Sequence, residues 1–356
     1  MKALMKVARG KCNVQLKEVP APEPAKGHVL IRVHVAAVCG TDVHIYYDRF
    51  PNSPPFVLGH EFSGVIESVC GDVESLRIGD RVVSANNPFA CGTCAICLRG
   101  YPNLCSHKKA MGIHSDGCFA EYVSLPACLI HHIPDNVSFE DAALMEPLAV
   151  AVHSVWHRCG IEPDDFVVVF GPGAIGLLAA QVARAEGARD VLIVGTNRDE
   201  GIRFECARKL GIDTVNIEKD NLRERVMDLT GGEGPDVVVE ASGSSSAIVS
   251  GMDLLRKNGR MAISGITGRP DVAIPWDQLV SKAVSLFFAY SSLNSDWQKA
   301  LGFVSANKVK TSVLITHRFG IEQWKDSFGM LERLEAIRPV LVMQAAGDMP
   351  VGGRCN

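Results

Sequence analysis

Residues 166–188 read FVVVFGPGAIGLLAAQVARAEGA, and this stretch sets the fold class of the chain. Gly171, Gly173 and Gly176 form a G-x-G-x-x-G pattern between five apolar residues and the start of a helical pattern. The first glycine permits a tight turn, the second lets the backbone approach a pyrophosphate, and the third lets helix and strand pack closely. A glycine-rich turn in some other α/β domain is the alternative, but the required strand, helix and second strand are all present. The stretch therefore predicts a dinucleotide-binding unit.

Around this stretch, apolar β-runs alternate with helical patterns. The runs after about residue 166 are FVVVF, DVLIV, DTVNI, DVVVEA and RMAIS. Helical stretches such as IGLLAAQVARAEG and GIRFECARKLG lie between them. Strands that alternate with helices form βαβ units, so we expect a parallel sheet here.

The chain up to about residue 150 differs, because its short β-rich runs are broken by glycine and proline. Examples are VLIRVHVAAV (29–38), FSGVIESV (62–69), DRVVSA (80–85) and FAEYVSL (119–125). Their rough alternation predicts antiparallel strands. Beyond about residue 290 come two helical stretches, WQKALGFVSA and QWKDSFGMLERLEA, and the apolar run PVLVM. We expect the last residues, GDMPVGGRCN, to form a loose tail.

The composition suits a globular protein of about two domains. The chain has 356 residues, of which 47% are hydrophobic and 21% are charged. A formal net charge of −4 provides no basic field that would attract nucleic acid or an anionic membrane. The amino terminus lacks the apolar core of a signal peptide, and polar residues interrupt every apolar run short of membrane-spanning length. We therefore expect a cytoplasmic protein with no nucleic-acid or membrane partner.

The segment CGTCAICLRGYPNLC contains four of the twelve cysteines, Cys91, Cys94, Cys97 and Cys105. Four thiolates can surround one Zn²⁺ tetrahedrally, and a loop with tight turns can bring them together. A dithiol redox pair needs only two cysteines, and the similar bacterial iron–sulfur run ends in Cys-Pro after a shorter gap. Because a closed four-thiolate site leaves no position for substrate, the segment predicts a structural zinc site. Cysteines that stand singly elsewhere are expected to be reduced, partly buried small hydrophobes.

A second set of potential metal ligands is spread along the first half of the chain. The ligand types in it are Cys39 in CGTDVH, which also holds Thr41, Asp42 and His44, then His60 and Glu61 in GHEFSG, and Glu146 in MEPLAV. One thiolate, one imidazole and one or two carboxylates can bind a catalytic zinc and leave a position for water or substrate. Each residue alone has an ordinary structural explanation, and spacing does not join segments so far apart. A catalytic metal site is therefore a hypothesis from residue chemistry.

The loop in DVLIVGTNRD, after the second strand of the dinucleotide unit, departs from the usual pattern. An acidic residue normally binds the adenosine ribose of NAD at this place, but Gly195 occupies it here. A small residue, the Thr196 hydroxyl and the Arg198 guanidinium suit a 2′-phosphate, which slightly favours NADP. In the alternative, Arg198 is a solvated loop charge, and Asp199 or the backbone serves NAD.

The order of these motifs closely resembles that of the zinc-containing medium-chain dehydrogenase/reductase family: CGTDVH, GHEFSGVIESV, the four-cysteine segment, MEPLAVAVH and the glycine pattern. The resemblance extends from residue 1 to about residue 343. Within the family the chain looks like the polyol (sorbitol/iditol) and threonine dehydrogenase branch, where a glutamate in an E-P-L motif replaces a cysteine ligand of the classical alcohol dehydrogenases. Glu146 holds that position here. Two features depart from the family pattern, namely Gly195 and the residues after Met343.

The resemblance implies an α/β fold of two domains. Residues 1–150, completed by 291–356, would form a GroES-like β-barrel catalytic domain, and residues 151–290 a Rossmann domain with a doubly wound parallel sheet. We also expect a homo-oligomer, either a dimer or a tetramer.

The resemblance also implies two zinc ions per chain and NAD(P) as the cofactor. The catalytic zinc would be bound by Cys39, His60 and one or both of Glu61 and Glu146, which members of this branch exchange with water. The structural zinc would be bound by Cys91, Cys94, Cys97 and Cys105.

The implied reaction is the reversible oxidation of a secondary alcohol to a ketone, with hydride transfer to nicotinamide and zinc as a Lewis acid. Thr41 beside Cys39, with His44 one helical turn on, resembles the family's relay of the substrate proton from a hydroxyl to an imidazole. His44 could instead be a loop histidine without a catalytic role.

The expected substrate is a small-molecule polyol or sugar-derived alcohol, with a threonine-like amino alcohol as the second choice. Tyr46, Tyr47 and Phe50 follow the relay and either line a pocket or pack in the interior. A nicotinamide-binding relative without dehydrogenase activity is the alternative from another class. Such a relative would be expected to have lost Cys39, His60 or Glu146, and all three are present.

Overall fold

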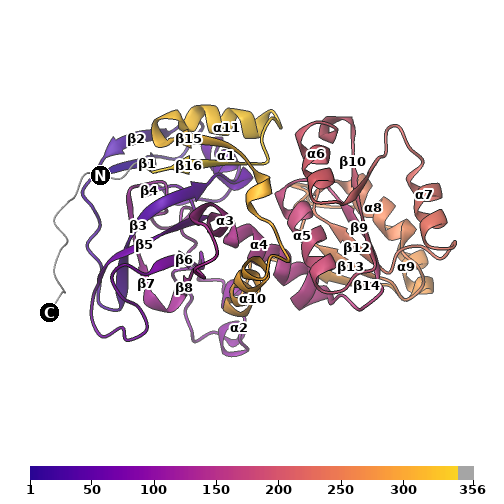
Figure 1. The fold of residues 1–356 in the computed structure, drawn as a ribbon, viewed down its shortest axis with the longest axis horizontal. Helices are drawn as coiled ribbons and strands as arrows, with labels where there is room; N and C mark the ends of the chain where they lie inside the picture. The colour runs from indigo at the N-terminus through magenta and orange to yellow at the C-terminus, as the bar shows by residue number, and fades with distance from the viewer. Residues whose placement is uncertain (344–356) are drawn as a thin grey trace. The chain divides into compact units, whose positions relative to one another are not determined.

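The computed structural model describes residues 1–343, which divide into two compact units (Figure 1). The first unit comprises Met1–Glu146, Leu293–Leu301 and the described chain from Ile315 onward. The second comprises Pro147–Ser292 and Gly302–Leu314. The expected loose tail, GDMPVGGRCN, lies outside the described residues. Among residues 1–343, no helix combines the length and the hydropathy that a membrane span requires.

The second unit is built on a six-stranded parallel sheet. Its strands are β9 (Phe166–Phe170), β10 (Asp190–Gly195), β11 (Asp213–Asn216), β12 (Val237–Glu240), β13 (Arg260–Ile263) and β14 (Ser285–Phe288). They lie in the order β11-β10-β9-β12-β13-β14, and each neighbouring pair is parallel. Numbered from β9, this order is 3-2-1-4-5-6, the arrangement of doubly wound dinucleotide-binding folds. The parallel sheet predicted from the alternating runs is therefore confirmed.

Helices connect the strands of this sheet. They are α5 (Ala174–Ala185), α6 (Ile202–Lys209), α7 (Leu222–Leu229), α8 (Ser245–Leu254) and α9 (Trp276–Lys282), and a π-helical segment, His153–Cys159, precedes β9. All five residues of β9 are buried, as expected of a strand with both faces covered. At the turn into α5, Gly171 has a φ of 95°, and a Cβ on Gly176 would lie 1.9 Å from the Gly171 carbonyl oxygen. Both positions therefore require glycine.

The first unit contains a seven-stranded, mainly antiparallel sheet. Its strands are β3 (His28–Ala37), β5 (Phe62–Val69), β6 (Arg81–Ser84), β7 (Tyr122–Pro126), β8 (Ile130–His132), β15 (Ile315–Gly320) and β16 (Arg338–Val342). The order is β15-β16-β3-β5-β6-β8, β7 also pairs with β3, and only β15 and β16 are parallel. The four runs predicted to be antiparallel strands form β3, β5, β6 and β7.

A smaller sheet and several short helices complete the first unit. The sheet has the order β2-β1-β4, with strands β1 (Lys2–Lys6), β2 (Val14–Glu18) and β4 (Phe56–Val57). The helices are α1 (Gly40–Tyr46), α2 (Ala95–Leu98), α3 (Phe139–Ala143) and α11 (Trp324–Glu332), while α4 (Met145–Val152) and α10 (Asn294–Ser305) each begin in this unit. Inward-facing residues of β3 and β5 form the core with Phe56, Phe119 and Phe328.

Candidate metal centres and cofactor loop

The pairing of β3 with β5 brings two of the predicted ligand segments together. Ala36 lies opposite Phe62 in the antiparallel register, so Cys39 just after β3 and His60 just before β5 lie at the same end of the sheet. Cys39 is also the residue that precedes α1, where the Asp42 carboxylate accepts a hydrogen bond of 2.8 Å from the Cys39 backbone N–H. Strand pairing and helix capping therefore position the Cys39 backbone.

A buried cluster forms at this end of the sheet. The ligand atoms of Cys39, His60 and Glu61 lie within 4.8 Å of one another. Glu146, in the first turn of α4, is also buried but lies outside this set. Its Oε1 accepts a hydrogen bond of 2.6 Å from Asn86 Nδ2. The charges of His60 and Cys39 still act on the Glu146 carboxyl, so all four predicted ligands belong to one electrostatic environment.

Two further buried charges, Arg338 and Asp42, support this cluster. Arg338, the first residue of β16, places Nη1 3.3 Å from Glu61 Oε1 and donates to the Val38 carbonyl oxygen. The Asp42 Oδ1 atom lies 3.5 Å from His60 Nδ1. A carboxylate behind a histidine is the usual way to orient a metal-binding imidazole. The sequence carried a signal for Asp42, which lies within CGTDVH, but none for Arg338.

These buried charges shift the pKa values of the cluster. Burial alone would raise the pKa of the Cys39 thiol, but Arg338 and His60 hold that pKa well below its ordinary value. Burial raises the pKa of Glu61 well above its usual range and raises the pKa of Glu146 to about 7. Burial would lower the pKa of His60, but neighbouring anions hold it well above the ordinary value. Cys39 is thus favoured as a thiolate, the form that binds metals.

The donors in this cluster fit a zinc ion. Glu61 is fully buried, and neither of its carboxylate oxygens accepts a hydrogen bond from the described residues, although Arg338 offsets part of the charge. Buried acceptors without donors cost free energy, and a cation would satisfy them. A thiolate, an imidazole and a carboxylate together form a donor set of catalytic zinc sites.

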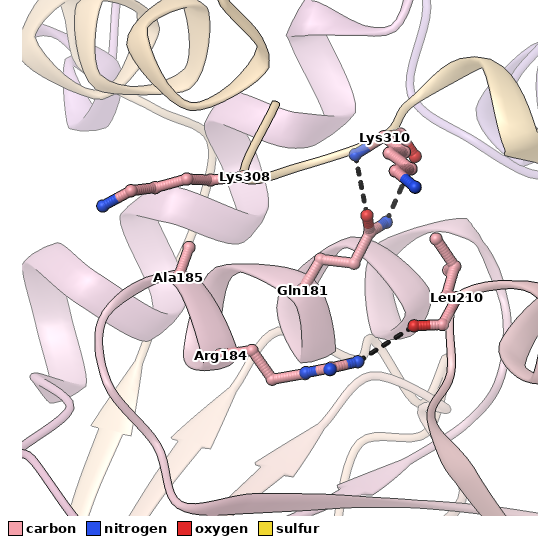
Figure 2. Close-up of a pocket in the computed structure, with 6 residues that line it drawn as sticks. All are labelled: Gln181, Arg184, Ala185, Leu210, Lys308 and Lys310. Carbon is pink, nitrogen blue, oxygen red and sulfur yellow. Dashed lines mark hydrogen bonds between the residues drawn. The ribbon is translucent and has the colours of Figure 1, made fainter. Parts of the chain in front are cut away.

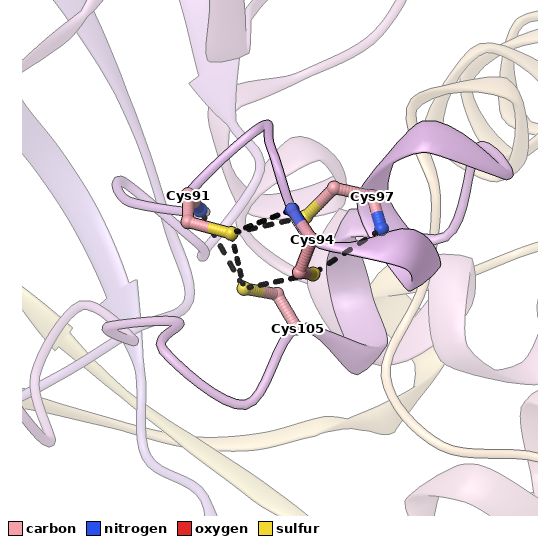
Figure 3. Close-up of side chains that lie close together, drawn as sticks. All are labelled: Cys91, Cys94, Cys97 and Cys105. Atoms are coloured by element: carbon pink, nitrogen blue, oxygen red, sulfur yellow. Dashed lines mark hydrogen bonds between the residues drawn. The ribbon is translucent and has the colours of Figure 1, made fainter.

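The four cysteines of the second predicted site converge around one point, as Figure 3 shows. Their sulfur atoms are 3.5 Å apart between Cys91 and Cys105, 3.9 Å between Cys91 and Cys97, and 4.0 Å between Cys94 and Cys105. Four thiolates at zinc–sulfur distances of about 2.3 Å in a tetrahedron would lie about 3.8 Å apart. None of these cysteines is in a disulfide. The geometry therefore fits a closed zinc site.

Backbone amides of the same loop stabilise these thiolates. The N–H of Cys94 points at Cys91 Sγ at 3.3 Å, and the N–H of Cys97 at Cys94 Sγ at 3.5 Å. Backbone N–H groups of Thr93 and Cys94 lower the pKa of Cys91 to about 5. The loop backbone thus favours the charged form of Cys91, whereas burial and the neighbouring thiols raise the pKa of Cys97 to about 12.

The cofactor loop holds its residues in a compact capping arrangement. Asp199 is buried, and its Oδ2 accepts hydrogen bonds of 3.0 Å from both the Thr196 backbone N–H and the Thr196 hydroxyl. The other oxygen pairs with Arg203 at 2.8 Å. The Thr196 hydroxyl proton and the Asp199 carboxylate are therefore engaged within the loop. Arg198 is exposed beside them.

Gly195 lies at the end of β10 with no room for a side chain. A Cβ there would lie 2.7 Å from Phe204 Cε1 and 3.0 Å from Asp199 Oδ2. The missing acidic residue thus has a packing explanation, because Phe204 of α6 occupies the space that it would need.

Two protein-family models match the chain. A model of the alcohol dehydrogenase GroES-like domain matches residues 25–135, and a model of zinc-binding dehydrogenases matches residues 174–306. The sorbitol dehydrogenase of Halalkalibacterium halodurans is 39% identical over 342 residues, which cover 96% of this chain and 99% of that protein. The chain belongs to the zinc-containing medium-chain dehydrogenase/reductase family.

Other members of this family are similar over their whole length. The L-threonine 3-dehydrogenase of Bacillus subtilis is 36% identical over 349 residues, 96% of this chain and 98% of that protein. The structure of an alcohol dehydrogenase from Thermus sp. ATN1 matches with a TM-score of 0.88 at 30% identity, covering 97% of this chain and 100% of that chain. The predicted family, fold class and reaction class are thereby confirmed. This medium-chain dehydrogenase is a zinc-type alcohol or polyol dehydrogenase with a GroES-like domain and a Rossmann domain.

In this dehydrogenase, both residues of the predicted proton relay lie on α1. The Thr41 hydroxyl lies 3.7 Å from Cys39 Sγ, beside the catalytic cluster. His44 is exposed on the following turn. No hydrogen bond joins the two side chains within residues 1–343.

The aromatic residues after the relay pack within the first unit. The Tyr46 ring makes edge contacts with Trp324 and Phe328 of α11, and the Tyr47 hydroxyl donates to Glu332 Oε2 at 2.9 Å. Phe50 packs against the core. Tyr46 and Tyr47 also line a small pocket of about 150 Å³ together with Trp324 and Phe328, so both of the roles considered apply to these two side chains, and Phe50 has the packing role.

A separate cavity of about 450 Å³ lies in the second unit, and Figure 2 shows the residues around it. It is lined by Gln181, Arg184, Ala185, Leu210, Lys308 and Lys310. Arg184 Nη1 donates to the carbonyl oxygens of Leu210 and Gly211 at the end of α6, and Gln181 bonds both backbone polar groups of Lys310. Cations at the carboxyl ends of helices stabilise those ends, so this cluster has a structural explanation. None of the predicted site residues lines the cavity.

Proposed function

We propose that this dehydrogenase oxidises a secondary alcohol of a polyol or sugar-derived substrate, with NAD(P) as the hydride acceptor and two zinc ions per chain. One zinc would be catalytic and held by Cys39, His60 and Glu61, with Glu146 as an exchangeable ligand. The other would be structural and held by Cys91, Cys94, Cys97 and Cys105. The observation that carries the proposal is the buried Cys39–His60–Glu61 set, in which a carboxylate without hydrogen-bond donors faces a thiolate and an imidazole.

The residues around this set would prepare the substrate for hydride loss. When bound, zinc supplies the Lewis acidity that lowers the pKa of a coordinated hydroxyl group. Arg338 would keep Cys39 deprotonated, and Asp42 would hold the His60 ring in place through Nδ1. The burial of His60 and Glu61 would keep bulk water away from them and strengthen these charges.

The substrate proton needs a route from this buried cluster to solvent. Thr41 Oγ1 lies beside Cys39, so its hydroxyl would accept the proton from the substrate and donate its own proton outward. His44, exposed on the same helix, would receive that proton at its imidazole, directly or through water.

For the cofactor we propose NAD(P), with a preference for NADP of no more than about tenfold. Arg198 is an exposed guanidinium without a partner side chain among the described residues, and such a group can pair with a 2′-phosphate. The preference would be small, because the Thr196 hydroxyl is already bonded and Arg203 is paired with Asp199. Among solved structures of similar proteins, one is bound to NADP and another to NADH.

The substrate proposal follows the relatives, since one of them is a sorbitol dehydrogenase. A threonine-like amino alcohol is the second candidate, because L-threonine 3-dehydrogenases match at 35–36% identity. We further propose a cytoplasmic homo-oligomer, a dimer or a tetramer, which size-exclusion chromatography with light scattering would test.

The deciding experiment combines elemental analysis with a substrate panel. Purified wild-type protein should contain two zinc ions per chain and should oxidise polyols faster than amino alcohols with NAD⁺ or NADP⁺. One zinc or none in carefully prepared protein would contradict the metal proposal. Faster oxidation of L-threonine than of any polyol would favour the second candidate.

A further inference from the structure

Asn86 bonds Glu146, beside the Cys39 cluster, through its side chain and Met111, just after the four-cysteine segment, through its backbone. It follows β6, its side chain is buried, and its Nδ2 donates a hydrogen bond of 2.6 Å to Glu146 Oε1. The two residues are 60 positions apart in the chain. No role was predicted for Asn86 from the sequence, where it is one of two adjacent asparagines in SANNPF.

The backbone of Asn86 is fixed at the base of the four-cysteine loop. Its carbonyl oxygen accepts from the Met111 N–H at 2.9 Å, and the Phe89 carbonyl oxygen accepts from the Lys109 N–H at 2.9 Å. These two bonds tie together the stretches of chain that lead into and out of the segment Cys91–Cys105. The Asn86 side chain therefore projects from a backbone that is tied to the chain beyond the cysteines, and its hydrogen bond to Glu146 fixes its direction.

The two candidate glutamate ligands are held by different chemistry. Glu61 lies within the ligand set and faces a guanidinium, since Arg338 Nη1 is 3.3 Å from Glu61 Oε1. Glu146 lies outside that set and is held by a neutral amide. The amide–carboxylate hydrogen bond fixes one oxygen of Glu146 without neutralising its charge. Glu146 is thus kept close to the cluster, and its carboxylate could still bind a cation if the hydrogen bond from Asn86 were lost.

We propose that Asn86 is a positioning residue that holds Glu146 outside the ligand set of the catalytic metal, so that a coordination position stays open for substrate. This inference rests on the proposed function, because it assumes a metal at Cys39, His60 and Glu61. An aspartate at position 86 could not do this, since two carboxylates would then face each other. The amide donates one hydrogen bond and adds no charge.

The test compares wild-type holoenzyme with the Asn86→Ala holoenzyme. Without the amide, Glu146 is free to join the ligand set, so metal release from the catalytic site to a chelator should slow about tenfold, within the usual range of effects for residues behind metal ligands. Co²⁺-loaded protein should also change its visible absorption spectrum as an oxygen ligand is added. Subtracting the spectrum of Co²⁺-loaded Cys39→Ser protein isolates the catalytic site.

Two controls make the effect specific. In a Glu146→Gln background, Asn86→Ala should change neither the release rate nor the spectrum, because a neutral amide at position 146 would not supply an anionic ligand. Asn52→Ala removes another buried amide of the first unit, one bonded to Asp48 and the Phe50 carbonyl, and should leave both readouts unchanged. If Asn86→Ala does not fold, the near-isosteric Asn86→Leu removes the donor with less loss of packing.

The outcomes separate this inference from the proposed function. Unchanged release and an unchanged spectrum in Asn86→Ala would overturn the positioning role, and so would faster release, which would mean that Asn86 helps Glu146 to bind. If Cys39→Ser contains as much zinc as wild type, the proposed function itself fails.

Discussion

The four-cysteine loop and the Cys39 cluster are built in opposite ways. The loop would take four identical ligands from fifteen consecutive residues, Cys91–Cys105, and its own backbone amides point at the sulfur atoms. The Cys39 cluster would take different ligands from separate segments, with Asp42 and Arg338 as charged neighbours.

This difference predicts how each centre responds to loss of its metal. The Cys39 cluster lies at the end of β3 and β5, whose pairing and core contacts exist without a metal. The four-cysteine loop has little regular structure, since it contains only the short helix α2 (Ala95–Leu98), which has no buried residue, and one 3-10 turn at Pro102–Leu104. We therefore expect the loop to depend on its metal for folding and the cluster to depend on its metal only for chemistry.

The largest expected effect is on turnover. Cys39→Ser should lower kcat at least 1000-fold, which is about 4 kcal/mol of transition-state stabilisation, because the catalytic metal is lost. The melting temperature should remain close to that of wild type. Steady-state kinetics, zinc analysis and thermal unfolding check the three statements. Cys118→Ser is the control, since Cys118 is a buried neighbour that donates to the Glu61 carbonyl oxygen but is no proposed ligand. Unfolding of Cys39→Ser would remove the contrast between the two centres.

The next effect is on stability. Cys97→Ser should remove one zinc and lower the free energy of unfolding by about 3 kcal/mol, the contribution of a ligand present at some hundred times its dissociation constant. Denaturant unfolding with and without added chelator measures this difference. Chelator should lower the free energy of unfolding of wild type but change that of the variant little. Cys128→Ser, which changes an exposed cysteine outside the loop, should have no comparable effect. A stable Cys97→Ser protein with wild-type zinc content would show that the loop folds and binds zinc with only three of its four cysteines.

A smaller effect on kcat tests the proposed proton relay beside the Cys39 cluster. Thr41→Val should lower kcat about 100-fold, or about 2.7 kcal/mol, with zinc content unchanged, whereas Thr41→Ser keeps the hydroxyl and most of the activity. His44→Ala should lower kcat less, because water can replace an exposed imidazole, and should alter the pH–rate profile. Wild-type turnover and pH dependence in both Thr41→Val and His44→Ala would exclude the relay.

The same contrast explains how far the sequence could be used for prediction. The glycine pattern and the cysteine segment are local, and a loop or turn of that composition has few other structures to adopt. Predicting the Cys39 cluster would have required the register of β3 against β5, which cannot be read from the spacing of residues in the sequence. Arg338 and Asn86 were not predicted, because each bonds a residue far away in the chain and neither lies in a motif.

Gly195 illustrates a different limit. Its position in the chain indicated a missing ribose-binding acid, and the interpretation was a site for a 2′-phosphate. In the structure, Phe204 fills the space next to it, so any side chain there would force Phe204 to shift, whatever the cofactor. A test by Gly195→Asp would therefore disturb α6 as well as the cofactor site, and a cleaner test has to use an exposed residue.

Arg198 is that residue, and it gives the smallest expected effect. It lies on a surface loop, so its hydrogen bond to a phosphate would be screened by solvent and worth about 1.4 kcal/mol, or tenfold in affinity. Arg198→Ala should weaken NADP binding by about that factor and leave NAD binding nearly unchanged, as measured by titrating both cofactors against protein fluorescence. Arg198→Lys keeps the charge but not the planar donor fork, so its affinity for NADP should lie between those of wild type and Arg198→Ala. The effect should shrink as salt concentration rises, because exposed charges are screened within about 10 Å at 0.1 M. If NAD binds wild-type protein much more tightly than NADP, Arg198 is only a surface charge. The four cysteines are restricted by one another, because their sulfur atoms lie within 4.8 Å, whereas the solvated Arg198 side chain has no such neighbours to restrict its role.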